Sequence, residues 1–270
     1  MDIGSILGLI IGFGGVLGGF MLEGGEPAAL VHEISAPIIV FGGTFGAVLL
    51  STPLSIIKNV PKALIGIFVV KKFDEIAIIH KLTELANKAR KDGLLSLEAE
   101  SQVTENELLK KGLGLIADGI EADVLREVLV REFELRENLH EQHAKVFEEA
   151  GGFCPTMGVC GTVMGMIMVL SKLGEGDMGE LGSSIATAFL AAMFGVGFAN
   201  LVFIPAAGRI KKNAEKEAFY NSLIIEGLLS INAGENPRIM AEKLNLSLLE
   251  KMAGRKPSAV AAGGQAGMGE

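Results

Sequence analysis

Pro155 and Thr162 stand seven residues apart in an apolar stretch, 151–173, that carries no ionisable side chain before Lys172. Seven residues are about two helical turns, so both side chains lie on one face of a helix. Proline cannot donate to the carbonyl of Gly151, four residues back, and glycine lets another backbone approach closely. The stretch also contains Gly158, Gly161 and Gly165. This face is suited to a partner helix or an ion path; the alternative is a helix that only packs within a bilayer.

Four apolar stretches in the chain hold no Asp, Glu, Lys, Arg or His in their interior. They are 3–22, 34–57, 151–173 and 181–208. Membrane proteins that move ions usually bind them at an ionisable side chain inside the bilayer. The chain therefore either moves no ions, as a structural scaffold would, or shares an ion path with a carboxylate of another polypeptide. A self-sufficient channel is a further alternative that the uncharged stretches allow.

Each stretch is long enough to cross the roughly 30 Å hydrocarbon core of a bilayer as a helix. We expect a transmembrane hairpin over 1–57 and two further membrane helices over 151–208. Basic residues follow the second and fourth stretches, whereas the loops at 23–33 and 174–182 contain neither Lys nor Arg. The positive-inside rule then predicts that both termini and the long middle segment are cytoplasmic.

The segments between and after the apolar stretches are charged and amphipathic, which favours helices over strands. We expect a cytoplasmic helical domain over 58–150, with its longest helix at 121–149, and a cytoplasmic helical segment over 209–250. Thr104 and Glu107 have the spacing of a capping box that opens a helix. Residues 251–270 lose all periodicity and are predicted to be a disordered tail.

Composition agrees with a multi-pass membrane protein, because 49% of the 270 residues are hydrophobic and the mean hydropathy is +0.44. The formal net charge is −8 and basic residues are scattered, which argues against a nucleic-acid partner. The N-terminus shows no positive region and no cleavage site, so we expect the first apolar stretch to stay in the mature protein. No glycine-rich phosphate loop follows a strand pattern, so the sequence does not indicate nucleotide binding.

Two other groups of residues have side chains suited to metal or thiol chemistry. His140 and His143, with Glu137 and Glu141 nearby, have a spacing that suits a divalent metal on a helix, but no third ligand is spaced convincingly. Two cysteines, at 154 and 160, form neither a CxxC motif nor a metal-ligand spacing, so we expect free thiols. We expect no cofactor and no metal.

Three segments carry a resemblance to a known family. The sequence FCPTMGVCGTVMG (153–165) resembles the third transmembrane helix of the MotA/TolQ/ExbB family of ion-driven motor subunits. ARKDGLLSLE (89–98) resembles the cytoplasmic charge motif of the MotA branch, and EGLLSINAGENPRIMAEKL (226–244) resembles the segment after its last membrane helix. The similarity extends from residue 1 to about residue 250.

This resemblance implies an all-α membrane protein with four transmembrane helices, a helical cytoplasmic domain and no enzymatic activity. It implies a stator subunit of the bacterial flagellar motor in the inner membrane. Family members form a ring of five around a MotB-like dimer, whose intramembrane aspartate carries the ion. Pro155 and Pro205 match functional prolines of the family, and Thr162 matches a hydroxyl beside the ion site. Thr162 also has the ordinary alternative of a bond back to the carbonyl of Gly158.

The resemblance also bears on the ion and on the rotor. Sodium-driven relatives have a pair of threonines where this chain has Ala191 and Ala192, and alanine offers sodium no oxygen ligand, so protons are favoured. Four charged residues match or adjoin the family motif that engages the rotor switch-complex protein FliG: Lys88, Arg90, Lys91 and Glu98. Without the motif, these charges would be an ordinary solvated face.

The alternative function within the family is an ExbB/TolQ-type energiser of outer-membrane processes. That branch is related to this chain in its last two membrane helices. It has one membrane helix before its large cytoplasmic segment, whereas this chain has a predicted hairpin there.

Overall fold

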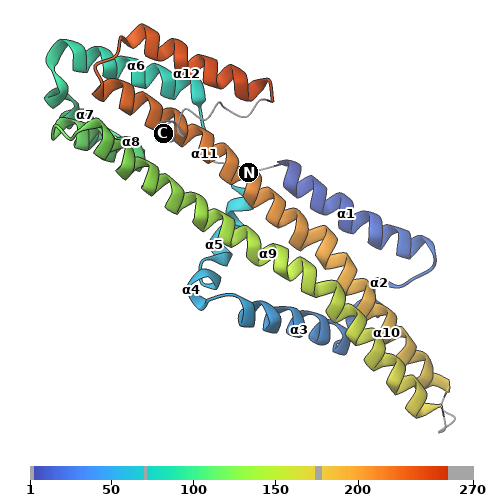
Figure 1. Cartoon of the computed structure of the whole chain (residues 1–270). Helices are drawn as coiled ribbons and strands as arrows, with labels where there is room; N and C mark the ends of the chain where they lie inside the picture. The colour runs from blue at the N-terminus through green and yellow to red at the C-terminus, as the bar shows by residue number, and fades with distance from the viewer. Residues whose placement is uncertain (1–2, 70–71, 174–177, 255–270) are drawn as a thin grey trace, which may run out of the picture. The chain divides into compact units, whose positions relative to one another are not determined.

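The computed structural model describes residues 3–69, 72–173 and 178–254, and in this part of the chain all regular structure is helical (Figure 1). The predicted all-α class is therefore confirmed. The helices up to residue 103 are α1 (Ile3–Leu22), α2 (Pro27–His32), α3 (Ser35–Ser51), α4 (Leu54–Ile57), α5 (Val60–Phe68), α6 (Glu75–Asp92), η1 (Leu94–Ser96) and α7 (Leu97–Val103). The later helices are α8 (Glu107–Ala117), α9 (Ala122–Lys172), α10 (Met178–Phe198), η2 (Ala199–Phe203), α11 (Ile204–Asn232) and α12 (Pro237–Met252).

Three helical segments of the described chain are long and apolar enough to cross a membrane: α1, α9 and the run from Gly179 to Asn232. The bounds of α1 agree with the predicted first stretch, 3–22. Helix α3 is also apolar but has 17 residues. A helix of that length spans about 26 Å, slightly less than the roughly 30 Å hydrocarbon core. A fourth span through α3 stays a prediction.

The predicted second stretch, 34–57, is not one helix. Helix α3 ends at Ser51, and Thr52 has an extended backbone with φ −119° and ψ 132°. Pro53 follows, and the residue before a proline is disfavoured in the helical conformation. A short helix, α4, then begins at Leu54. The proline, present in the sequence, is the physical reason for the break.

Helix α9 joins two segments that were predicted separately, 121–149 and 151–173, into one helix of 51 residues. It passes through Pro155 without ending. A proline removes one hydrogen bond from a helix, and the bonds on either side of it hold the long helix together.

The predicted capping box at Thr104 and Glu107 is wrong. Asn106 is the N-cap of α8, and its side chain accepts the backbone N–H of Leu109 at 2.9 Å. Thr104 instead ends α7, and its hydroxyl donates to the carbonyl of Glu100 at 2.8 Å. An asparagine carbonyl satisfies a free N–H of the first turn as well as a threonine hydroxyl does, and it stands directly beside the helix start.

The described chain forms two compact units. Unit 1 consists of the described residues of Met1–Lys71 and Asn138–Ala214, and unit 2 of those of Lys72–Glu137 and Glu215–Glu270. Helices α9 and α11 contribute residues to both units. The predicted membrane boundaries at residues 57, 150, 208 and 250 stay predictions. Helix α12 reaches Met252, and the predicted tail from residue 255 onward lies outside the described residues.

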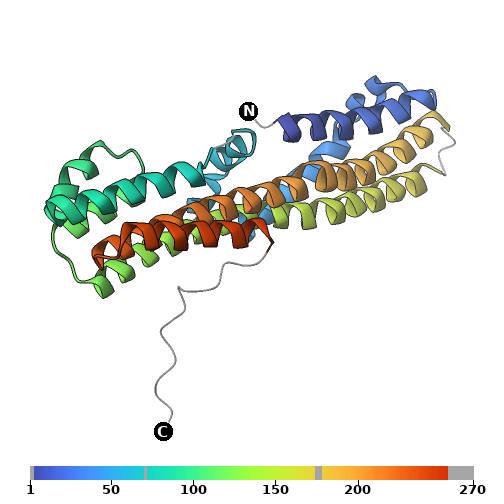
Figure 2. The same ribbon diagram turned by 90° about the horizontal axis from the view of Figure 1, so that it is seen from above.

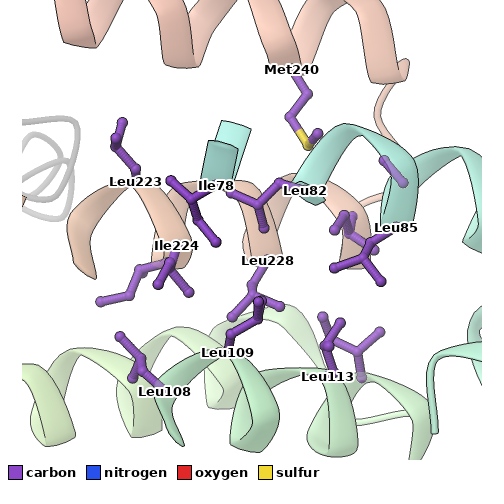
Figure 3. Packing of buried hydrophobic residues seen from close by; sticks show 14 of the residues in the cluster. Ile78, Leu82, Leu85, Leu108, Leu109, Leu113, Leu223, Ile224, Leu228 and Met240 are labelled. Atoms are coloured by element: carbon purple, nitrogen blue, oxygen red, sulfur yellow. The ribbon is translucent and has the colours of Figure 1, made fainter. Parts of the chain in front are cut away.

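The core of unit 2 consists of large aliphatic side chains. Leu228 of α11 lies between Leu82 of α6 and Leu109 of α8, and all three are almost completely buried (Figure 3). Met240 of α12 covers the same cluster. Burying side chains of this size supplies most of the stability of a helical domain in water.

Unit 1 has a core of smaller side chains and an apolar exterior. Five of its completely buried residues are alanines or a cysteine: Ala36, Ala144, Cys154, Ala191 and Ala199. Helix α1 buries none of its residues, and large apolar side chains such as Ile11 and Leu50 are exposed. An apolar exterior on long helices is the surface that a lipid bilayer covers.

Candidate functional site

Helices α9 and α10 lie side by side in unit 1, in contact through their smallest residues (Figures 1 and 2). A Cβ atom added to Gly158 would lie 2.9 Å from the carbonyl oxygen of Ala191 and 3.1 Å from the Cα of Gly195. A Cβ atom added to Gly195 would lie 2.8 Å from the carbonyl oxygen of Cys154. The two backbones therefore approach so closely that only glycine fits at these two positions.

The contact continues along both helices in steps of three and four residues. A Cβ atom at Gly161 would lie 2.6 Å from the Cβ of Ala191, and one at Gly165 would lie 2.6 Å from the Cβ of Ala188. Gly158, Gly161 and Gly165, which were predicted to admit a partner helix or an ion, thus admit a helix of the same chain.

Thr162 ties α9 to α10 at the same contact. Its hydroxyl lies 3.0 Å from the carbonyl of Gly158 on its own helix and 3.0 Å from the carbonyl of Ala188 on α10. A hydroxyl has one hydrogen, so the two carbonyls share it or take it in turn. The predicted bond back to Gly158 is therefore present, together with a second acceptor that the sequence did not reveal.

The two prolines occupy different local structures. Pro155 lies half-buried inside α9, whereas Pro205 is the second residue of α11, which begins directly after a π-helical turn, η2. Because proline has no N–H, Pro205 leaves the carbonyl of Leu201 without its usual donor, and the helix is widened over the same residues. Single π-helical turns are frequently found at functional sites.

Ala191 and Ala192 differ in how deeply they are buried at the contact between α9 and α10. Ala191 is completely buried against Gly161, whereas Ala192 is only half-buried. Of the two, Ala192 is the more exposed, although a Cβ atom added to Gly158 would lie 3.4 Å from its Cα. The choice of ion stays a prediction.

Two carboxylates near the two ends of α3 accept hydrogen bonds from hydroxyl groups, and sequence reasoning missed both. Glu149 of α9 accepts the hydroxyl of Ser51 at 2.6 Å, where α3 ends. Glu33, before α3, accepts the hydroxyls of Ser183 and Thr187 of α10 at 3.1 and 2.9 Å. No local sequence signal pairs residues so far apart in the chain.

The charged residues of 88–98 lie in unit 2 around one tight turn. Arg90 and Lys91 occupy the last turn of α6, Gly93 makes the turn with φ +84°, and Glu98 is in the first turn of α7. The side chains of Arg90, Lys91 and Glu98 are exposed, and none of them forms an ion pair with another described residue. They are therefore available to a partner.

Lys88 differs from its three neighbours because it is paired within the chain. Its ammonium donates to Glu100 of α7 at 2.8 Å, and Lys81 donates to the other oxygen of Glu100 at 3.1 Å. Hydrogen bonds from Lys88 and then Lys81 hold the pKa of the Glu100 carboxyl below its ordinary value. Sequence reasoning missed Glu100, although it stands only two residues from Glu98.

The histidines and cysteines are the remaining side chains suited to metal or thiol chemistry. No group of three or more His, Cys, Asp or Glu side chains there is arranged to hold a metal ion. Cys154 is buried and Cys160 is exposed, and both are free thiols.

Comparison with known proteins covers both units. Residues 6–93 match the Motility protein A N-terminal family, and residues 100–220 match the MotA/TolQ/ExbB proton channel family. Motility protein A of Bacillus subtilis is 34% identical over 252 residues, which cover 93% of this chain and 92% of that protein.

Two solved structures have the same fold along almost the whole chain. The C. jejuni MotAB structure has a TM-score of 0.84 with 31% identity and covers 90% of this chain and 94% of its own. The flagellar MotAB stator complex from Bacillus subtilis has a TM-score of 0.82 with 31% identity. The match covers 92% of this chain and 97% of that chain. With a full-length relative at this identity, the chain belongs to the MotA/TolQ/ExbB proton channel family, within which it is a MotA protein.

Proposed function

We propose that the chain is the MotA-type stator subunit of a bacterial flagellar motor, which works in an oligomer with a MotB-like partner and converts a proton gradient into torque. The family membership and the full-length similarity to MotAB stator complexes support this function. It is a multi-pass protein of the inner membrane. We place both termini and unit 2 in the cytoplasm and α3 as the fourth membrane helix.

One observation carries the proposed mechanism: the interiors of the four apolar stretches contain no ionisable side chain. A proton carrier must bind and release a proton within the bilayer, and none of these side chains titrates in the required range. The carrier then belongs to the partner, and we assign it to an intramembrane aspartate of a MotB-like single-span protein. A ring of five chains around two such partners is the arrangement that the family implies.

In this mechanism the chain supplies a shaped, apolar path beside the partner's carboxylate. Thr162 and Ala192 lie on or next to the α9–α10 contact, and Pro155 and Pro205 lie in the same two helical runs. Protonation removes the partner's charge, and a neutral carboxylic acid is tolerated in an apolar environment far better than a carboxylate. Repeated protonation would then move the partner's helix against α9 and α10. No covalent step is required, which is why we propose no enzymatic activity.

The rotor side of the mechanism falls on unit 2. Arg90, Lys91 and Glu98 are exposed around one turn and unpaired within the described chain, so they are suited to contact the charged surface of FliG. Contacts between exposed charges are worth only about 0–1 kcal/mol each. A motor that must break its contacts at every step needs pairs of this strength.

The alternative of an ExbB/TolQ-type energiser has less support. The match to the Motility protein A N-terminal family includes the segment of α1, α2 and α3, which is the predicted hairpin that distinguishes the MotA branch. A scaffold or a self-sufficient channel would leave the charged turn at 88–98 without a role.

The proposal is tested by swimming speed in a bacterium that lacks its own stator and expresses this chain with its MotB-like partner. We expect speed to collapse on addition of a protonophore and to be unchanged when external sodium is replaced by potassium. The partner's intramembrane Asp→Asn variant is the control and should abolish swimming. Speed that vanishes without sodium would refute the assignment of protons.

A further inference from the structure

Helix α6 carries two basic residues and helix α7 two acidic residues at the same spacing. Lys88 and Arg90 are two residues apart on α6, as are Glu98 and Glu100 on α7. Two residues on a helix point about 200° apart, so one member of each couple faces away from the other. Lys88 and Glu100 meet at 2.8 Å between the helices, which leaves Arg90 and Glu98 exposed.

Glu100 is held from two points along α6. Each of its carboxylate oxygens accepts one lysine, Lys88 at 2.8 Å and Lys81 at 3.1 Å. These lysines are two turns apart, roughly 10 Å along the helix axis. A carboxylate bonded at both places restrains α7 in its position along α6 as well as in its distance from it.

Helix α7 is too short to hold its position by itself. It has seven residues and buries only Leu97 and Ser101 among its side chains. Helices of this length are not stable by themselves and take their position from tertiary contacts. Glu98 is one residue after the buried Leu97, so any rotation of α7 would move the Glu98 carboxylate relative to Arg90.

We propose that Glu100 is a positioning residue, which fixes α7 on α6 through Lys81 and Lys88 and thereby sets the spacing of Arg90 and Glu98 on the rotor-facing surface. This inference rests on the proposed function for the role of that surface. It also assigns Lys88 a task inside the chain, in contrast to the exposed Arg90 and Lys91. Lys88 acts on the rotor only through Glu100.

The first test is local and does not depend on motility. In the full chain purified with its partner, Glu100→Gln removes the charge and keeps the side-chain size. We expect amide hydrogen exchange over 97–103 to become about five-fold faster, as expected for the loss of an exposed ion pair. Glu105→Gln is the matched control, since Glu105 is exposed and forms no ion pair with another described residue, and it should leave exchange unchanged. Unchanged exchange in Glu100→Gln would overturn the restraint.

A double variant tests whether Lys88 acts through Glu100. Lys88→Gln should accelerate exchange less than Glu100→Gln, because Lys81 remains bonded. The variant with both changes should match Glu100→Gln alone, since the two residues act through one contact. Additive effects would contradict the assignment of Lys88.

The second test measures torque per stator in cells with beads attached to the flagella. Glu100→Gln should lower torque and Glu105→Gln should not. A charge reversal on FliG that recovers Arg90→Glu should fail to recover Glu100→Gln, because Glu100 does not touch the rotor.

Faster exchange with normal torque would overturn the positioning role and leave the proposed function intact. Normal torque after reversal of both Arg90 and Glu98 would instead refute the rotor surface itself, and with it the role of Glu100.

Discussion

The two units are both helical, but their helices are held together by different means. Unit 2 buries large aliphatic side chains such as Leu82 and Leu228, as a water-soluble domain does. Unit 1 brings backbones into direct contact at Gly158 and Gly195 and leaves large apolar side chains exposed. A bilayer offers no gain for burying apolar groups, so close packing must replace the hydrophobic effect there. The difference teaches that unit 2 should be most sensitive to lost side-chain volume, and unit 1 to volume added at the contact between backbones.

The largest loss of stability is expected from a cavity in unit 2. Leu82→Ala should cost about 2–5 kcal/mol, because the side chain is completely buried and its neighbours relax only partly. Leu95→Ala is the matched control, since Leu95 is 70% exposed. Denaturant unfolding of the purified protein, followed by circular dichroism, measures both. An equal loss of unfolding free energy in the two variants would contradict the claim that buried aliphatic side chains hold unit 2 together.

Added volume in unit 1 should have the next largest effect. Gly158→Ala places a methyl group against the backbone of α10, which cannot move aside, and overpacking of this kind costs about 1–3 kcal/mol. Gly152→Ala on the same helix is the control, as no atom lies within 4 Å of the added Cβ. Gly227→Ala in unit 2 should cost less than Gly158→Ala, because it meets only the side-chain end of Leu82. The same unfolding measurement ranks the three variants, and a control as destabilised as Gly158→Ala would refute the contact.

A smaller effect is expected from pH at Glu100. Its folded-state pKa lies below the ordinary value of 4.5, so its pairs with Lys88 and Lys81 stabilise the fold above that value. This contribution, about 0.2–1 kcal/mol for exposed pairs, is lost as pH falls through the folded-state pKa. The difference in unfolding free energy between the unmodified chain and Glu100→Gln should therefore shrink toward zero on acidification. A difference that is independent of pH would show that the carboxylate charge does not matter.

The smallest effect on stability is expected where the effect on function is large. Reversing Arg90 or Glu98 should change the unfolding free energy by no more than about 0.5 kcal/mol, because both side chains are exposed. Torque should nevertheless fall, and more when both are reversed. A complementary reversal on FliG should recover part of it, since complementary charges set register and association rate more than affinity. Loss of the protein from the membrane would assign the two residues to folding.

The sequence predicted the elements whose signals are local. The bounds of α1 follow from an uncharged apolar run, and the all-α class follows from helical periodicity. The break before Pro53 also has a local signal, the proline itself, yet the predicted stretch 34–57 extended past it. The capping of α8 was misassigned because Thr104 and Asn106 are both good N-caps, and only the backbone conformation decides between them.

The site was predicted less completely than the fold. Arg90 and Glu98 were found through a family motif, whereas Glu100 was missed, because an ion pair between residues 88 and 100 depends on the turn at Gly93. The contact of Gly158 with Gly195 was anticipated only as close approach to some helix. Which helix approaches is a tertiary property that glycine spacing does not encode.

The central claim is that this chain shapes an ion path but does not carry the ion. Proton flux into liposomes, driven by a potassium diffusion potential, tests it directly. The chain reconstituted alone should show no flux above empty liposomes, and the complex with its MotB-like partner should conduct. The partner's Asp→Asn variant should return flux to the empty level. Proton flux through the chain alone would contradict the account.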